Sequence, residues 1–529
     1  MQHILALAPV ALTLFIAFQT RRMVLAFISG ILSASLIYKD FSPLGAVTFS
    51  ITRFAEKIEF FNLFNLSAFF SSTRLFIFIF LIAVGCVIEI IRISGASTAY
   101  AQFIKKYIKA RQQAECATLG LALFLFFDDY FNTITTASVM KQITDLFGIA
   151  RVRCAQLIGN TSTSIAAIMP LSTWGAAIVG TLASAGINMD TTGLIPQNAF
   201  FVFLWSIPFA LYPISLIIVT WITTLEGTLI GYAQHEQHLA DLKSSHHEPT
   251  GHHHFIEPEK NTATLTDFFI PIITLIASLI LAILYTGKFY LISGNNSLFE
   301  AINNCKLELS MFMSGIYTLL VTVSWFIIRK KIKLLSFLEC LKEGFLMMFP
   351  SIIILSLSWT FSSIISQELS IGKIIIEQLL PLFSMNYLPP AFFAVSALTA
   401  FCLGSSWGTM TLLYPIAIPM LAHLQSGTFD ILLFKTIGAI LSGAVLGNNT
   451  SPLADLGTMT SSVTNISQME YIKAQIDFNK PIAWAIFLTL VATSFIETPS
   501  YTINLFSCLS MAILLSWIGV KTYSQLEQQ

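Results

Sequence analysis

The stretch Leu121–Met140, LALFLFFDDYFNTITTASVM, places an acidic pair inside sequence that is otherwise apolar enough for lipid. Asp128 and Asp129 follow seven apolar residues. A charge at membrane depth costs roughly 2.5–3.5 kcal/mol on insertion scales, so two adjacent carboxylates need a cation, protons or a polar cavity. The ordinary alternative is a pair at a helix end, reaching the lipid headgroups or capping the next helix. The stretch therefore predicts either a functional site in the membrane or a capped helix end.

The whole chain has the composition of a membrane protein. Of its 529 residues, 55% are hydrophobic and only 11% are charged, whereas an average soluble domain is about 25% charged. Several segments reach the ~20 apolar residues that span a bilayer. The formal net charge of zero gives no sign of a nucleic-acid partner. We expect an all-α polytopic membrane protein with about 11 transmembrane helices.

Basic residues on both sides of the acidic stretch constrain its path through the membrane. Positive residues in short loops mark the cytoplasmic side, and basic clusters lie at 92–111 and at 141–153. A single crossing would put one cluster outside, whereas a re-entrant hairpin that enters and leaves from the cytoplasm satisfies both. We therefore predict a re-entrant hairpin near 116–140 with the Asp pair at its tip, where irregular backbone can be buried in protein or line a cavity.

A second re-entrant hairpin is predicted near 389–424, broken at Gly404-Ser-Ser-Trp-Gly-Thr409. Its polar break aligns with the acidic pair, and the run Gly447-Asn-Asn-Thr-Ser-Pro452 aligns with Gly159-Asn-Thr-Ser-Thr-Ser164. We expect both of these runs to interrupt long helices, and the first of these helices, at 154–187, to be interrupted again at Pro170 and at Ser172-Thr-Trp-Gly175. Interrupted segments at matching positions of two halves point to a transporter's midplane binding site. The chain is therefore predicted to contain two inverted repeats.

The predicted halves are residues 1–228 and 266–529, joined by a hydrophilic loop at 229–265. This loop holds seven of the nine histidines. Their spacing matches no fixed metal-ligand pattern, which favours a solvated linker over a metal sensor. The chain carries no H-E-x-x-H, G-x-S-x-G or Walker A pattern, so we expect a protein that is not an enzyme.

The predicted site is rich in oxygen atoms, the ligands of a hard cation such as Na⁺. Burial favours a protonated carboxylate and a nearby cation favours an ionised one, so such a group can exchange a proton for a cation. That exchange is the chemistry of antiport. The predicted ion- or substrate-binding residues are Asp128, Asp129, Asn132, Thr133, Asn160, Thr161, Ser162, Ser405, Ser406, Thr409, Asn448, Asn449, Thr450 and Asp455. Na⁺ is expected at Asp128, Asp129 and Asp455; Na⁺ and H⁺ would be transported or coupling ions, with no cofactor and no catalytic residue.

The motif F-D-D-Y-F-N-x-x-T-x-x-S-V-M-x-x-I-T-D at 127–145 resembles the NhaC-type sodium/proton antiporter family, within the ion transporter superfamily. The resemblance continues through P-L-S-T-W-G at 170–175, S-S-W-G-T at 405–409 and G-N-N-T-S-P-L-A-D at 447–455. It implies a secondary antiporter of the bacterial inner membrane, with inverted repeats, hairpins and an elevator-like movement. Members of the family exchange organic acids as well as Na⁺ and H⁺.

The chain departs from the family pattern at positions that would carry charge. Asn160 stands where the family usually has Asp, and Gly447-Asn448 stands where it usually has Gly-Asp. Fewer carboxylates leave less charge to bind Na⁺ and carry protons. A cation- or proton-coupled transporter of a small organic solute, such as an amino or carboxylic acid, therefore stays open beside a Na⁺/H⁺ antiporter that works by alternating access. Membrane lipid and a second copy of the chain are the expected partners.

Overall fold

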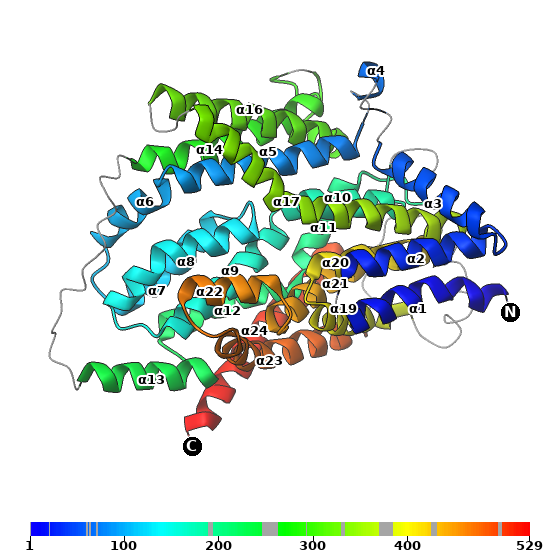
Figure 1. The fold of residues 1–529 in the computed structure, drawn as a ribbon. Helices are drawn as coiled ribbons and strands as arrows, with labels where there is room; N and C mark the ends of the chain where they lie inside the picture. The colour runs from blue at the N-terminus through cyan, green and yellow to red at the C-terminus, as the bar shows by residue number, and fades with distance from the viewer. Residues whose placement is uncertain are drawn as a thin grey trace.

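The computed structural model describes residues 2–528 except 21, 60–61, 63–64, 70–71, 189–193, 246–262, 293, 330–333, 370–384, 425–430 and 496–499. The chain is helical (Figure 1). The helices of the first half are α1 (Gln2–Thr20), α2 (Met23–Tyr38), α3 (Pro43–Lys57), α4 (Leu66–Phe69), α5 (Arg74–Ile93), α6 (Ala96–Lys105), α7 (Arg111–Phe124), α8 (Asp129–Leu146), α9 (Arg151–Ile168), α10 (Thr173–Ser184), α11 (Ala199–Ser206) and α12 (Leu211–Glu226). They are followed by α13 (Gly231–Ser245), α14 (Leu265–Thr286), α15 (Leu298–Asn304), α16 (Leu307–Ile328), α17 (Leu334–Ser363), α19 (Leu388–Leu403), α20 (Ser406–Leu424), α21 (Ile431–Thr450), α22 (Asp455–Thr464), α23 (Gln468–Thr493) and α24 (Tyr501–Gln528).

The all-α multi-pass class is confirmed. Within the described residues, eight helices are long and apolar enough to cross a membrane, and the bent pair α9–α10 would make a ninth. Two shorter apolar helices accompany them, at Val24–Tyr38 and Ala199–Phe209. The expected number of about 11 spans, which rests on segment length, and the inverted relation of the two halves stay predictions.

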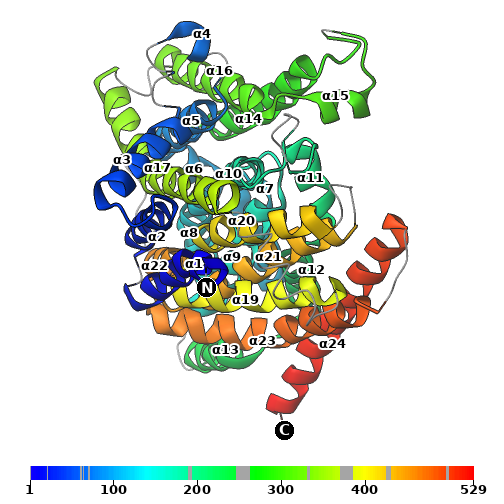
Figure 2. The ribbon, with the colours of Figure 1, turned by 90° about the vertical axis from the view of Figure 1, so that its right-hand side faces the viewer.

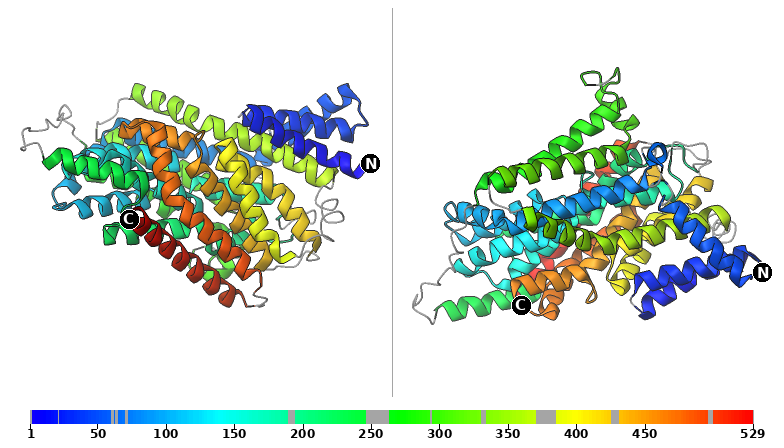
Figure 3. Two further views of the ribbon diagram at one scale, coloured as in Figure 1. Left: turned by 90° about the horizontal axis from the view of Figure 1, so that it is seen from below. Right: turned by 45° about the horizontal axis from the view of Figure 1, so that its top comes forward.

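The helices form two packed groups. α5 packs against α16 and α17, and α14 packs against α16; α5, α14 and α16 lie along one side of the molecule (Figures 1 and 2), while α17 also packs against α10 and α20. The second group contains α7 to α12 and α19 to α24, with α24 lying along α23 and α12 (Figure 3). The two predicted hairpins both belong to the second group.

Both predicted hairpins are helical hairpins in the structure. α7 packs against α8 around a turn at 125–128, and the Asn132 side chain closes it by donating Nδ2–H to the Ala122 carbonyl at 2.6 Å. α19 packs against α20 around Gly404, whose φ of +64° suits glycine. A Cβ at Gly404 would also lie 2.5 Å from the Leu453 carbonyl oxygen, so the turn requires glycine twice over. Their entry from one side of the membrane stays a prediction.

The predicted interruption at 159–164 is wrong, whereas those at 170–175 and at the end of 447–452 are confirmed. Residues 159–164 lie inside the continuous helix α9, and the break falls at Met169–Ser172, where α9 and α10 meet at 46°. Gly447 likewise lies inside α21, where it lets the helix approach α19: a Cβ there would be 2.3 Å from the Ala397 carbonyl oxygen. The second break comes at 451–454. Each true break contains a proline, Pro170 or Pro452, which cannot continue the hydrogen-bond ladder of a helix.

The first part of the predicted linker is a docked helix, which corrects the expectation of an open loop. α13 packs against α9 and α23. Gln237, only 2% exposed, accepts a hydrogen bond from the Ala150 amide at 2.7 Å and donates one to the Gly148 carbonyl at 2.8 Å. At the start of the helix, the Tyr232 amide donates to Asp477. Most of the histidine-rich segment lies at 246–262, outside the described residues.

Candidate functional site

The tip of the first hairpin places Asp128 at the start of α8 as its N-cap. Its Oδ1 accepts a hydrogen bond from the Phe131 amide at 2.9 Å, while its Oδ2 accepts one from the Thr173 hydroxyl at 3.0 Å. The Thr173 amide donates to the Phe127 carbonyl at 2.8 Å, which fixes the tip against the start of α10. The capping role considered from the sequence is therefore real for Asp128, which is 2% exposed.

Asp129 is the first residue of α8 and is 4% exposed. The Trp174 indole lies beside its carboxylate. No basic side chain acts on Asp128 or Asp129 within the described residues. Burying a charge without a partner is costly, so this pair is a place where protons or a cation must compensate.

Asp455 begins α22 and is exposed, unlike the buried pair. The Tyr130 phenol lies within electrostatic reach of Asp455 as well as of Asp128 and Asp129, because α22 packs against α8. In the part of the chain that the structure describes, no three His, Cys, Asp or Glu side chains converge as a metal site. The expected Na⁺ site at these three carboxylates thus stays a prediction, and it would need neutral oxygens or a movement of α22.

Two predicted neutral residues of α8 face inward at the hairpin. Asn132 is held by the Ala122 carbonyl and accepts a hydrogen bond from Thr136 at 3.1 Å. Thr133 donates to Ser162 of α9 at 2.9 Å. Thr133 lies one helical turn from Asp129, so the Thr133–Ser162 pair belongs to the surroundings of the carboxylates.

Asn160 lies on another face of α9. It donates Nδ2–H to the Thr220 hydroxyl of α12 at 3.1 Å, while Ser162, two residues on and thus about 200° around the helix, meets α8. Thr161 bonds back to the Leu157 carbonyl of its own helix. α9 therefore divides the predicted site into a side that faces the carboxylates and a side that faces α12.

The predicted residues of the second half surround the start of α20 and the end of α21. Ser405 caps α20 by accepting from the Gly408 amide at 3.1 Å, and the Ser406 hydroxyl donates to the Ala444 carbonyl at 2.9 Å. Asn449 donates to Tyr212 of α12 at 3.5 Å. The remaining three make local contacts: Thr409 and Thr450 donate to carbonyls of their own helices, and the Asn448 carbonyl accepts from the Ser451 amide.

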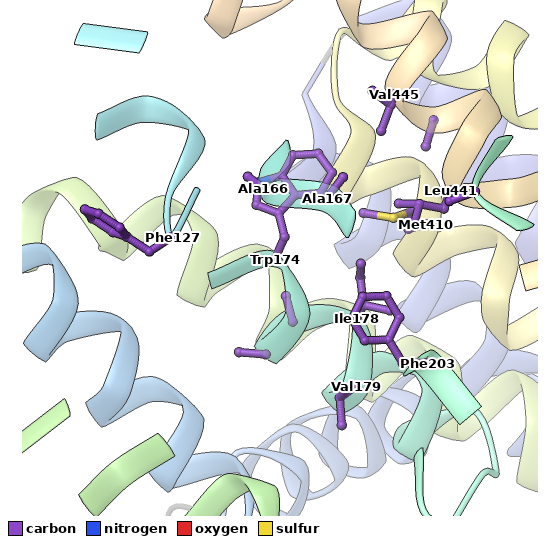
Figure 4. Packing of buried hydrophobic residues seen from close by; sticks show 14 of the residues in the cluster. Phe127, Ala166, Ala167, Trp174, Ile178, Val179, Phe203, Met410, Leu441 and Val445 are labelled. Atoms are coloured by element: carbon purple, nitrogen blue, oxygen red, sulfur yellow. The ribbon is translucent and has the colours of Figure 1, made fainter. Parts of the chain in front are cut away.

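Two tryptophans bring the two hairpin regions together. The rings of Trp174 and Trp407 meet edge to face, with centroids 5.7 Å apart. Trp174 points into the packed core between the halves, where Ala166 and Ala167 of α9 face Met410 of α20 and nearby residues of α21 (Figure 4). The carboxylate pair thus lies at a seam between the two halves of the chain.

Several polar residues near the site were missed by sequence reasoning. Thr173 and Trp174 belong to the motif at 170–175, in which the sequence alone gives these two residues no role. Tyr212 donates to Asn479 at 2.7 Å, and Asn479 in turn donates to Gln475 one helical turn earlier. For Tyr212, Asn479 and Gln475, the available signal in the sequence was a phenol or amide group inside an apolar segment.

A further buried network lies at the other end of the hairpin. Arg153, 1% exposed, pairs with Glu115 at 3.1 Å and also donates to Gln156 and Thr224. Beside it, a cavity of about 310 Å³ separates the start of α7 from α13. Its lining residues are Arg111, Gln112, Glu115, Thr224, Gly227, Leu229, Gln237 and Asp241. Every polar side chain of this lining has a hydrogen-bond or ion-pair partner, and no predicted site residue lines the cavity.

Comparison with known proteins gives a family match and distant structural likenesses. Residues 186–496 match the Na⁺/H⁺ antiporter family. The chain is 24% identical, over 93% of its length and 91% of the other, to an uncharacterized protein of Haemophilus influenzae. Among solved structures, it is similar to the YdaH transporter of Alcanivorax borkumensis, with 13% identity, 83% and 84% coverage of the two chains and a TM-score of 0.48. It is also similar to MtrF of Neisseria gonorrhoeae, with 11% identity, 90% and 85% coverage and a TM-score of 0.41.

Proposed function

Because this chain belongs to the Na⁺/H⁺ antiporter family, we propose that it is a secondary transporter that exchanges Na⁺ for H⁺ by alternating access. Its place is a membrane that it crosses several times, and we propose the bacterial inner membrane. Asp128 and Asp129 are proposed as the exchanging groups, with Thr133 and Ser162 among the neutral oxygens around them.

One observation carries the proposal: two adjacent carboxylates are almost fully buried and have no basic partner among the described residues. In such surroundings the uncharged, protonated form is favoured until a cation arrives, and the cation then favours the ionised form. Proton release and cation binding are thereby coupled at one place. A purely structural pair would be expected to have a basic neighbour, as Glu115 has in Arg153.

The two carboxylates have different surroundings and so take different parts. Asp128 accepts two hydrogen bonds and holds the end of α8. Asp129 does not cap the helix, and its carboxylate lies beside the Trp174 indole, so we assign it the larger share of proton exchange. The Trp174–Trp407 contact lies where the two halves meet, and separation of the halves at this contact would expose the pair to one side of the membrane at a time.

Asn160, which stands where the family usually has Asp, is a weaker argument against antiport than the sequence alone implied. Asn160 contacts Thr220 of α12 rather than the Asp pair. Its neutral side chain therefore removes no charge from the α8 side of α9, where the proposed exchange takes place.

A second candidate is exchange of a small organic solute. The observation that favours it is the aromatic pair Trp174 and Trp407 beside a neutral second tip formed by Ser405 and Ser406. Aromatic faces bind apolar or cationic parts of organic molecules. Such a solute would still need the carboxylates as the coupling groups.

Flux in proteoliposomes tests both candidates. The purified chain is reconstituted, a pH gradient is imposed, and Na⁺, K⁺ and a panel of amino and carboxylic acids are added in turn. Na⁺-dependent dissipation of the gradient supports antiport, and dissipation that requires an organic solute supports the second candidate. Protein-free liposomes and the Asp129→Asn variant are the controls. No response to any of these additions would contradict the assignment of proton exchange to the pair.

A further inference from the structure

The polar run inside α9 contains hydroxyls of two kinds. Residues 160–164 are all 0% exposed. Thr161 and Ser162 donate to carbonyls one turn back, at Leu157 and Ile158, each at 2.9 Å. Thr163 and Ser164 have the same option, because any helical Ser or Thr can reach the carbonyl four residues earlier. Neither uses it, and neither has another partner within the described structure. The hydroxyls of Thr163 and Ser164 are therefore buried without a hydrogen-bond partner among the described residues.

Asn160 adds a third unpartnered oxygen on the same face. Its Nδ2–H is used by Thr220, which leaves Oδ1 without a partner. Positions 160, 163 and 164 are spaced i, i+3 and i+4, so their side chains are neighbours on one side of the helix. Asn160 shows which side this is, since it contacts α12. The Asp pair is on the other side, where Ser162 meets Thr133.

The helices that pack on α9 bring further oxygens without partners. α12 and α21 both contact α9 and each other. Ser215 Oγ of α12 and Asn449 Oδ1 of α21 are buried and unpartnered. Asn160 and Asn449 each donate a side-chain N–H to a hydroxyl of α12, and the side-chain carbonyl oxygen of each has no partner. The atoms left over on these amides are acceptors, which suits a cation and not an anion.

We propose that the face of α9 formed by Asn160, Thr163 and Ser164 binds a small dehydrated monovalent cation through neutral oxygens. Hard cations take hydroxyl and amide oxygens as ligands. Since none of the three side chains ionises at physiological pH, occupancy of this face is independent of pH, in contrast to the carboxylate pair. The proposal rests on the proposed function only for the choice of Na⁺ as the first ion to test.

The test measures cation binding separately from transport. The full chain in lipid nanodiscs is titrated with Na⁺, Li⁺ or K⁺ against choline, and both thermal unfolding and binding of radioactive Na⁺ are followed. The double variant Thr163→Val/Ser164→Ala is compared with Thr489→Val/Ser206→Ala, whose buried hydroxyls already bond within α23 and α11, outside both proposed cation sites. We expect the first variant to raise the half-saturating concentration at least roughly tenfold, and the second to change it less than about twofold.

The fold gives an independent control. Replacing an unpartnered buried hydroxyl by an apolar group of similar shape is neutral or stabilising, so the Thr163/Ser164 variant should fold in the absence of added cation and lose only the cation-dependent part of its stability. Ser164→Ala alone serves if the double variant does not fold. Wild-type cation binding by these variants, or no stabilisation of the wild type by any of the three ions over choline, would overturn the proposal. If Asp129→Asn loses H⁺ exchange but still binds the cation, the result supports the proposed cation site on α9. If the wild type binds Na⁺ at this face but moves no protons, the result refutes only the proposed antiport.

Discussion

Asp129→Asn separates a transport role from a structural one more cleanly than any other change at the hairpin. Asn keeps the size of the side chain but cannot ionise. At the first position of α8 an anion gains about 0.3–2 kcal/mol from the helix N-terminus. A charge at membrane depth costs roughly 2.5–3.5 kcal/mol. The difference, about 0.5–3 kcal/mol, is removed with the charge, so the variant should unfold at the same temperature as the wild type or higher.

Asp128→Asn is the matched comparison, because Asp128 also caps the helix. Asn caps as well as Asp, so its Oδ1 can still accept from the Phe131 amide, and the loss of stability should be below about 1 kcal/mol. Asp128→Ala removes the cap and the acceptor of the Thr173 hydroxyl, and should cost about 1–2 kcal/mol. Stability should therefore fall in the order Asp129→Asn, Asp128→Asn, Asp128→Ala.

The assay pairs flux with stability on the same preparations. Na⁺-driven proton movement in proteoliposomes should drop to the rate of protein-free liposomes in Asp129→Asn, while thermal unfolding in detergent shows an intact fold. If both Asn variants transport at the wild-type rate from acidic to alkaline pH, the pair is not the exchange site. Asp128 would then be a capping residue, and Asp455 would become the next carboxylate to test.

Three further outcomes are expected. Glu115→Gln leaves Arg153 as a buried cation without its carboxylate and should destabilise the protein by about 3–5 kcal/mol. The double variant Glu115→Gln/Arg153→Met should recover most of this loss. Equal unfolding temperatures for the single and double variants would contradict this expectation. Deletion of 246–262, which spares the docked helix α13, should leave flux unchanged, and loss of a metal response that the wild type shows would restore the metal-sensor interpretation. Single cysteines at Arg111 and Ile149, which flank the first hairpin, should react with an impermeant thiol reagent from the same side of the membrane; reaction from opposite sides would mean a plain crossing.

The hairpins could be predicted because their signals were strong and local. Polar or glycine residues inside long apolar segments indicated a break near Asp128 and another near Gly404, and the structure has turns at both places. The helix break predicted at 159–164 was wrong and the one at 170–175 was right, while the break predicted across 447–452 comes only at Ser451-Pro452, since residues 447–450 are helical. Asn, Ser, Thr and Gly weaken an isolated helix because their side chains compete for backbone groups. In the buried helices α9 and α21, tertiary packing overrides this weakness.

The docked helix α13 shows a second limit. Its sequence is polar, and such a segment is ordinarily a solvated loop. Its position depends on single polar contacts, such as those of Gln237 with the backbone of residues 148 and 150. A hydrogen bond between a side chain and a distant backbone group leaves no periodic pattern in the sequence, so this docking could not be predicted.

Which residues of the candidate site share one binding face could be decided only from the three-dimensional structure. From the sequence, Asn160, Thr161 and Ser162 were assigned together because they are adjacent. In a helix, adjacent residues point about 100° apart, so the three side chains go to α12, to the backbone of α9 and to α8. Because residues 159–164 form a helix and not an unwound loop, the adjacent side chains of Asn160, Thr161 and Ser162 cannot share one ion. The same geometry gathers Asn160 with Thr163 and Ser164, and a single fact, whether residues 159–164 are helical, decides between the two groupings.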